Sequence, residues 1–207
     1  MSPTLKLIIY DRDGTLNEDR DDYVTSAEEW LPLPGALEAV ARLTQAGWHA
    51  VVATNQSGLG RGLFDMAALN AMHLKLNEHL ARAGGRLDAI FFCPHVPSDE
   101  CNCRKPLPGL MLQIAERYAI DLKGVPAVGD TLRDLQAARA AGCEPHLVLT
   151  GKAGAMDEAQ LAEMLAQVPG TLVHKDLAAF ADFVLGRDRR ARGLAEESDS
   201  VLGGPAR

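Results

Sequence analysis

The chain has 207 residues, of which 47% are hydrophobic and 24% charged. This length and composition allow a sizeable core and exclude a wholly disordered or collagen-like chain. Lys and Arg total 21 against 28 Asp and Glu, so the net charge is −7. An acidic chain without a local basic patch is a poor binder of nucleic acid and of anionic membranes, so we expect neither as a partner.

The first apolar run, residues 7–10, is ended by an aspartate. It is too short for the core of a signal peptide or for a membrane span. The sequence therefore predicts a cytoplasmic protein, which we expect to act as a monomer.

Short apolar runs alternate along the chain with segments of helical periodicity. The predicted strands cover residues 5–10, 48–54, 87–92, 126–128, 146–150 and 172–173, and the predicted helices cover 34–47, 65–83, 108–118, 132–141, 157–167 and 177–185. This alternation indicates βαβ units, hence an α/β fold with a doubly wound parallel sheet in one domain over residues 1–186. Residues 187–207 are rich in Arg, Glu, Ser and Gly, and we expect a disordered tail there.

Polar residues directly follow several predicted strands, where ligands bind in folds of this class. The segment 11–15 reads Asp-Arg-Asp-Gly-Thr, Thr54 ends the second strand, and Lys105 lies in a loop before a helix. Gly129-Asp130 follows a later strand, with Asp134 four residues further on. Taken alone, the paired aspartates are also typical of a turn or a strand end. Their glycine is too early for a calcium-binding loop of the EF-hand type.

The ordered set of these four pieces resembles the haloacid dehalogenase-like (HAD) phosphatase superfamily, and the resemblance implies a Rossmann-like fold. It also implies that Asp11 is a nucleophile that forms an aspartyl-phosphate and that Asp13 is the general acid and base. Thr54 and Lys105 would bind the phosphoryl oxygens.

The same resemblance implies a catalytic Mg²⁺ with Asp11, Asp13 and Asp130 as its acidic contacts. Asp13 needs a raised pKa to carry a proton, and neighbouring carboxylates favour that shift. Asp134 would lie behind these contacts, where it could hold Lys105. About forty residues separate Asp13 from Thr54, enough for a loop and one helix. We therefore expect no large cap domain and an open site.

Three cysteines and a histidine, Cys93, His95, Cys101 and Cys103, crowd into the loop 93–103. Three thiolates and one imidazole are typical of a structural zinc site, with no position left open for water. A disulfide from Cys93 to Cys101 or Cys103, or a set of inert buried thiols, is the alternative. The fourth cysteine, Cys143, is predicted to be a small buried hydrophobe. Zinc would fix this loop and so orient the Arg104-Lys105 pair that follows it.

Within the superfamily, a zinc loop before Arg-Lys-Pro is similar to two groups, the D-glycero-D-manno-heptose 1,7-bisphosphate 7-phosphatases and the histidinol-phosphatases. Three stretches favour the heptose group: T-N-Q-S-G-L-G-R-G from Thr54, C-R-K-P-L-P-G from Cys103, and T-G-K from Thr150. That group removes the 7-phosphate and leaves heptose 1-phosphate for the nucleotide-activated heptose of lipopolysaccharide. The chain departs from its pattern over residues 19–23 and at Thr131, where lysine is frequent.

The resemblance to the heptose group also suggests which residues contact a phosphorylated sugar. These are Arg12, Asp19, Tyr23, Asn55, Gln56, Ser57, Arg104 and Thr131. The Arg104 guanidinium suits the remote phosphate or the sugar hydroxyls. Two alternatives stay open: a histidinol-phosphatase, and a non-enzymatic zinc-stabilised module, which the intact set of aspartates opposes.

Overall fold

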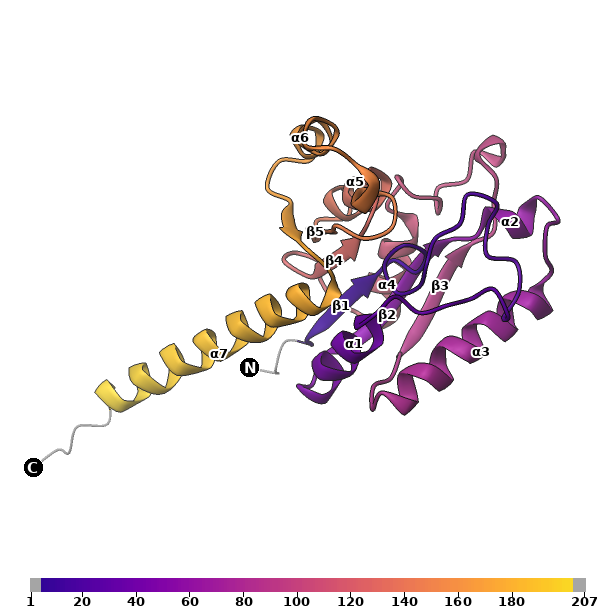
Figure 1. Cartoon of the computed structure of the whole chain (residues 1–207). Helices are drawn as coiled ribbons and strands as arrows, with labels where there is room; N and C mark the ends of the chain where they lie inside the picture. The colour runs from indigo at the N-terminus through magenta and orange to yellow at the C-terminus, as the bar shows by residue number, and fades with distance from the viewer. Residues whose placement is uncertain (1–4, 203–207) are drawn as a thin grey trace, which may run out of the picture.

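Six parallel strands form the centre of the fold in the computed structural model, which describes residues 5–202 without the side chains of 192 and 194–202 (Figure 1). The strands are β1 (Leu7–Tyr10), β2 (His49–Asn55), β3 (Ala89–Cys93), β4 (Pro126–Gly129), β5 (Glu144–Val148) and β6 (Leu172–His174). The helices are α1 (Ala36–Gln45), α2 (Ser57–Gly60), α3 (Met66–Arg82), α4 (Gly109–Tyr118), α5 (Leu132–Ala140), α6 (Glu158–Gln167) and α7 (Leu177–Leu202). Short 3-10 turns occur at Pro97–Asp99 and Ala153–Ala155.

The strand order is β3-β2-β1-β4-β5-β6, so the direction of chain progression across the sheet reverses between β1 and β4. Ile9 lies opposite Ala127, Tyr10 lies opposite Val128, and the Asp11 amide donates to the Val128 carbonyl over 2.8 Å. Such a reversal leaves a crevice beyond the carboxyl ends of the two strands, where α/β folds bind their ligands. The residues that follow β1 and β4 therefore meet at this crevice.

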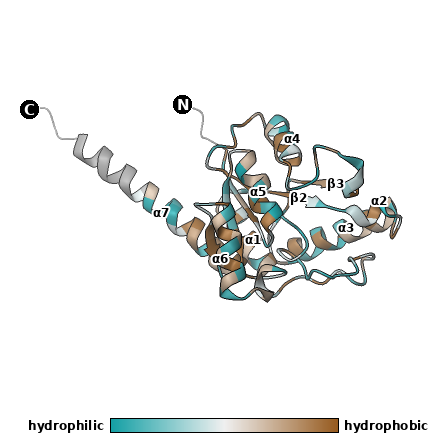
Figure 2. Cartoon of the chain, turned by 90° about the horizontal axis from the view of Figure 1, so that it is seen from above, coloured by the Kyte–Doolittle hydropathy of each residue, from teal (hydrophilic) through white to brown (hydrophobic). Residues whose placement is uncertain are grey.

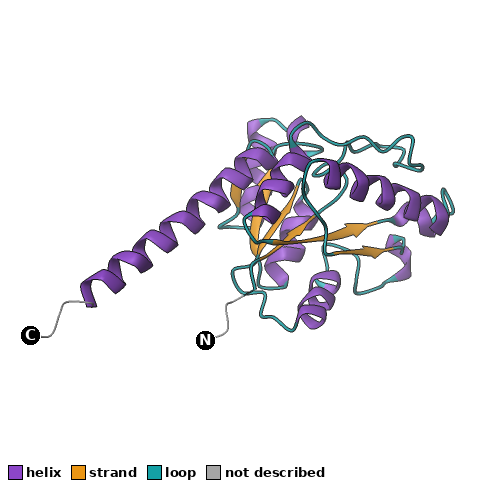
Figure 3. Cartoon of the chain, turned by 90° about the horizontal axis from the view of Figure 1, so that it is seen from below, coloured by secondary structure: helices purple, strands orange, loops and turns teal. Residues whose placement is uncertain are grey.

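Alternation along the strands divides the core into two layers (Figure 3). Ile8 and Tyr10 point into the layer that contains α1, α3 and α7, whereas Leu7 and Ile9 point into the layer that contains α4 and α5. Each large apolar side chain buried in this way contributes about 1.5–3 kcal/mol. α4 shows the corresponding amphipathic pattern, with a hydrophobic and a hydrophilic side in Figure 2. The predicted doubly wound parallel sheet is confirmed.

The predicted elements are all present, and apart from the C-terminal end of α7 their ends are shifted by only a few residues. Asp65 caps α3 as expected, because its carboxylate accepts from the Ala68 amide over 2.8 Å. The loop after β2 contains the short helix α2, which was not predicted. Between β1 and β2 the chain forms a loop and α1, so within residues 5–202 no large cap covers the crevice.

Residues 187–202, expected to be a disordered tail, form the continuation of α7, which runs to Leu202 and extends away from the sheet (Figure 1). Residues 203–207 lie outside the described part of the chain. Ala, Arg, Leu and Glu, which are frequent in this segment, have high helix propensities. Ion pairs of 2.7 Å from Arg187 to Glu144 and from Lys6 to Asp188 fasten its beginning to the sheet. Among the described helices, none is both long and apolar enough to cross a membrane.

Candidate active site

Three carboxylates converge at the crevice between β1 and β4. Asp11 follows β1, Asp130 follows β4, and Asp134 lies in the first turn of α5. Their oxygens lie within 4.8 Å of one another, and both Asp130 and Asp134 are buried. Like charges at this separation repel strongly in a desolvated site, so the cluster needs a compensating cation.

Burial is the main cause of the raised pKa of two of these groups. It raises the pKa of Asp11 to about 7 and that of Asp130 to about 8, and the charge of Asp134 adds to both shifts. One oxygen of Asp130, Oδ1, is buried without a hydrogen-bond partner in the described part of the chain. An unpartnered buried carboxylate oxygen beside a second carboxylate suits a hard divalent cation such as Mg²⁺. Asp11 and Asp130 are the residues that fit this ion.

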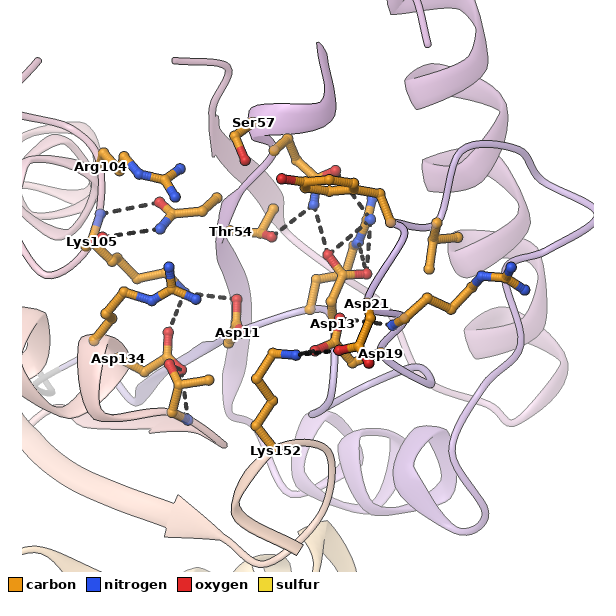
Figure 4. Close-up of a pocket in the computed structure, with 18 residues that line it drawn as sticks. Asp11, Asp13, Asp19, Asp21, Thr54, Ser57, Arg104, Lys105, Asp134 and Lys152 are labelled. Atoms are coloured by element: carbon orange, nitrogen blue, oxygen red, sulfur yellow. Dashed lines mark hydrogen bonds and ion pairs between the residues drawn. The ribbon is translucent and has the colours of Figure 1, made fainter. Parts of the chain in front are cut away.

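A cation already lies at the crevice: the side chain of Lys105 reaches Asp11 and Asp134 (Figure 4), and it is only 3% exposed. Its Nζ lies 2.7 Å from Asp11 Oδ1 and 2.5 Å from Asp134 Oδ1, and it donates to the Ala53 carbonyl over 2.9 Å. Burial by itself lowers the pKa of this amine, but the charges of Asp11 and Asp134 outweigh burial and raise the pKa. The expected hold of Asp134 on Lys105 is confirmed by this ion pair.

The backbone of Lys105 is fixed from the end of β2. Asn55 Oδ1 accepts from the Lys105 amide over 3.0 Å, and Asn55 Nδ2 donates to the Lys105 carbonyl over 3.1 Å. Asn55 thus couples the strand end to the loop that carries the cation. This backbone role was not foreseen, because the sequence suggested Asn55 only as a sugar contact.

Asp13 faces away from the acidic cluster. Its carboxylate accepts hydrogen bonds from Arg12, from Asn17 Nδ2 over 2.9 Å and from Gln56 Nε2 over 2.8 Å. Burial by itself raises the pKa of Asp13, but the Arg12 charge and these hydrogen bonds outweigh burial and lower the pKa. The prediction of a raised pKa is therefore wrong for this structure, because a guanidinium lies beside Asp13 in place of further carboxylates. Asp134, rather than the Asp13 carboxylate, completes the acidic cluster.

The residues expected to contact substrate line one cleft above this cluster (Figure 4). They are Arg12, Asp19, Tyr23, Asn55, Gln56, Ser57, Arg104 and Thr131. Arg12 differs from the rest, because it is 1% exposed and its guanidinium is already bonded to Asp13 and Gln56. Thr54, expected beside the phosphate, also lines the cleft, and its hydroxyl accepts from Gln56 Nε2 over 3.0 Å.

Lys152 is a cleft residue that was not assigned from the sequence, although the T-G-K stretch contained the signal. Its amide donates to Asp130 Oδ2 over 2.7 Å. Its Nζ lies 3.1 Å from Asp19 and 3.2 Å from Asp21, which connects the segment after β5 to the loop around residues 19–23. Arg20, Asp21 and Arg133 also line the cleft, and Arg20 is paired with Asp22 over 2.9 Å.

Two glycines make room for the Asp130 carboxylate. Gly14, at φ +80°, and Gly151, at φ +48°, lie so close that a Cβ on either would overlap Asp130 Oδ2. Both positions also require the left-handed backbone region that glycine adopts without strain. The glycines after β1 and β5 are therefore part of the construction of the site.

Gly14→Ala is expected to lower kcat by about 10- to 100-fold, because the added methyl group displaces a carboxylate of the site by a fraction of an ångström or more. The matched control is Gly124→Ala, which has a similar φ of +75° but no atom within 4 Å of the new Cβ. Both variants should lose about 1 kcal/mol of stability through backbone strain. Thermal unfolding and phosphate-release kinetics measure the two effects, and equal activity of the two variants would contradict this account.

The zinc-loop residues also converge. The sulfurs of Cys93, Cys101 and Cys103 lie 3.2, 3.5 and 3.7 Å apart, and His95 Nδ1 lies 3.3 Å from Cys103 Sγ and 3.5 Å from Cys93 Sγ. Tetrahedral ligands at a Zn–S distance near 2.3 Å are separated by about 3.8 Å, whereas a disulfide requires about 2.05 Å. All four cysteines are free thiols, so the disulfide alternative does not hold. Cys143 is buried, as predicted.

A doubly wound sheet with a cluster of carboxylates and a buried lysine at its switch point is the arrangement of a phosphatase of the HAD class. Residues 102–180 match a family model described as HAD-hydrolase-like. The chain is 59% identical over 184 residues to the D-glycero-β-D-manno-heptose-1,7-bisphosphate 7-phosphatase of Bordetella bronchiseptica, covering 87% of this chain and 98% of the relative. The chain belongs to this family of heptose bisphosphate phosphatases.

Two further comparisons agree with this assignment. The enzyme of the same name from Pseudomonas aeruginosa is 51% identical over 179 residues, which cover 86% of this chain and 97% of the relative. The crystal structure of the B. bronchiseptica phosphatase complexed with magnesium and phosphate superposes with a TM-score of 0.82 at 58% identity, covering 88% and 99% of the two chains. That complex holds the ion and the anion that the acidic cluster and Lys105 suit here.

Proposed function

We propose that this chain hydrolyses the 7-phosphate of D-glycero-β-D-manno-heptose 1,7-bisphosphate in a Mg²⁺-dependent reaction and releases heptose 1-phosphate. The observation that carries the proposal is the position of Asp11 at the switch point of the sheet. Lys105 Nζ lies 2.7 Å from its carboxylate, and the neighbouring Asp130 has one buried oxygen without a hydrogen-bond partner in the described part of the chain. The named relatives and the magnesium and phosphate of the B. bronchiseptica structure support the same reaction.

In the first half of the reaction, a carboxylate oxygen of Asp11 attacks phosphorus and the bond from phosphorus to the sugar oxygen breaks. Asp13 gives a proton to the departing alkoxide, and the negative charge of the bound phosphate favours its protonated form against the effect of Arg12. In the second half, Asp13 takes a proton from water, which attacks phosphorus and frees Asp11. Lys105 and Thr54 bind the phosphoryl oxygens throughout. Mg²⁺, held by Asp11 and Asp130, would neutralise charge on the phosphoryl group.

The cleft supports a substrate with a second anionic group. Beyond Lys105, the side chains of Arg104 and Arg133 line its wall, and Arg104 is positioned by a 3.3 Å hydrogen bond to the His95 carbonyl in the zinc loop. Guanidinium groups match phosphate geometry well. We assign Arg104 to the 1-phosphate or to sugar hydroxyls, and Asp19, Tyr23, Asn55, Gln56, Ser57 and Thr131 to the edges of the same cleft.

We also propose that Cys93, His95, Cys101 and Cys103 bind a structural Zn²⁺. The support is that one ligand atom of each residue lies within 4.8 Å of all the others, which brings three sulfurs and one imidazole nitrogen together as a tetrahedral zinc site requires. We further propose that the protein is a cytoplasmic monomer that binds neither nucleic acid nor membranes. The net charge of −7 disfavours binding to these two anionic partners.

A side-by-side assay with the heptose bisphosphate and histidinol phosphate tests the proposed substrate. We expect kcat/KM to be at least about 100-fold higher for the heptose bisphosphate, because a site built for two anions loses one set of contacts with a monophosphate. Heptose 7-phosphate is the matched control, since it lacks only the 1-phosphate. A preference for histidinol phosphate would overturn the assignment, and failure to cleave any phosphate ester with Mg²⁺ would favour a non-enzymatic module.

A further inference from the structure

Arg12 is a buried cation that the proposed mechanism does not use. It lies between Asp11 and Asp13 in the sequence, yet its side chain is 1% exposed. Its Nε donates to Asp13 Oδ1 over 3.1 Å, and its Nη2 lies 2.8 Å from Oδ1 and 3.0 Å from Oδ2 of the same carboxylate. The guanidinium therefore donates to Asp13 through two nitrogens, and few of its N–H groups are left for hydrogen bonds to a substrate.

The guanidinium is itself held on its far side. Nη2 donates to Gln56 Oε1 over 3.1 Å, and Nη1 lies 3.4 Å from His73 Nε2 on α3. Burial takes a guanidinium out of water, and this cost must be offset by pairing and hydrogen bonding. These contacts, from Gln56 directly after β2 and from His73 on α3, fix the plane of the guanidinium and, through it, the plane of the Asp13 carboxylate.

Asp13 is fixed from its other sides as well. Asn17 Nδ2 donates to Oδ1 over 2.9 Å and Gln56 Nε2 donates to Oδ2 over 2.8 Å. The Gln56 amide also reaches the Thr54 hydroxyl, so Asp13 is connected to a residue beside the phosphate. Its side chain keeps 21% exposure, which leaves the carboxylate open to the cleft. A carboxylate that is held in one orientation and is still open to the cleft is suited to exchange a proton with a bound substrate at one defined position.

We propose that Arg12 is a positioning residue for Asp13: its guanidinium, held by Gln56 and His73, aims the carboxylate at the oxygen of the leaving group. The inference rests on the proposed function, because it takes Asp13 as the acid and base of the phosphatase. It predicts that Arg12 matters most when the departing oxygen needs a proton. A sugar alkoxide needs one, whereas p-nitrophenolate departs without one.

The test compares these two leaving groups in wild type and in Arg12→Lys. This variant keeps the positive charge but cannot donate to Asp13 through two nitrogens at once. We expect kcat on the heptose bisphosphate to fall by about 10- to 100-fold with KM within about threefold. Single-turnover release of p-nitrophenolate from its phosphate, which reports the first half-reaction alone, should change by less than about threefold. Equal losses on both substrates would indicate a structural role and overturn the proposal, as would no loss on the heptose bisphosphate.

A second pair of variants decides the matter if Arg12→Lys does not fold. His73→Leu removes the acceptor for Arg12 Nη1, and His73→Gln keeps an acceptor at this position. We expect the same selective loss for His73→Leu and near-normal kinetics for His73→Gln, and identical behaviour of the two would refute the inference. If wild type cleaves another sugar phosphate instead, the proposed function fails and the comparison on that substrate still tests Arg12. No hydrolysis at all would overturn both.

Discussion

Asp11→Asn is expected to reduce turnover by about 10⁴-fold or more, because an amide oxygen cannot replace the carboxylate that attacks phosphorus. The fold should persist. Lys105 keeps its 2.5 Å contact with Asp134 and its hydrogen bond to Ala53, and the change removes one of three mutually repelling carboxylates. We therefore expect a melting temperature at least equal to that of wild type in the absence of Mg²⁺. Phosphate release and thermal unfolding are the measurements.

The matched control is Asp121→Asn, an exposed aspartate that precedes β4, at the opposite end of the sheet from the crevice. It should retain full activity. Mass spectrometry should first show that the Asp11→Asn protein is free of deamidation. If this protein still hydrolyses the sugar phosphate, the aspartyl-phosphate mechanism is ruled out.

Cys103→Ala is expected to release the bound zinc and to lower the free energy of unfolding by several kcal/mol, since a structural metal contributes directly to folding. Cys103 is buried, and its sulfur lies 3.2 Å from Cys93 Sγ and 3.5 Å from Cys101 Sγ. Activity should fall with stability, because Arg104 and Lys105 directly follow this ligand. Elemental analysis should find about one zinc per chain in wild type and none in the variant.

Cys143→Ala is the control for this experiment. Cys143 is also a buried cysteine, but it belongs to neither of the metal-ligand clusters of the described residues. It should keep its zinc and lose about 1 kcal/mol or less for the smaller side chain. A metal-free wild type with full activity and an unchanged melting temperature would refute the zinc site.

The fold was predictable because its signals are local. Short apolar runs bounded by turns mark the strands, and capping residues such as Asp65 mark helix starts. The extent of α7 was not predictable in the same way. Its residues beyond 186 have no apolar periodicity, and the ion pairs from Arg187 to Glu144 and from Asp188 to Lys6 join residues that are far apart in the sequence.

The members of the site were predictable in part, because parallel strands bring their carboxyl ends to one edge. Asp11, Asp130 and Lys105 could be found from strand positions and spacing. Lys152 was missed because its role depends on a loop that lies against Asp130 and on a pairing with Asp19 over more than a hundred residues.

Residue type and spacing were enough to predict the α/β class and to show the resemblance to the heptose phosphatases. That resemblance implies the nucleophilic role of Asp11, and the crowding of three cysteines and a histidine favours a zinc site. Only the tertiary structure decided the direction in which each side chain points. Asp11 and Lys105 are 94 residues apart, and Gln56 reaches Asp13 across 43. Such long-range contacts place Asp134 rather than Asp13 in the acidic cluster, and contacts from Gln56 and His73 hold the buried Arg12 against its neighbour Asp13.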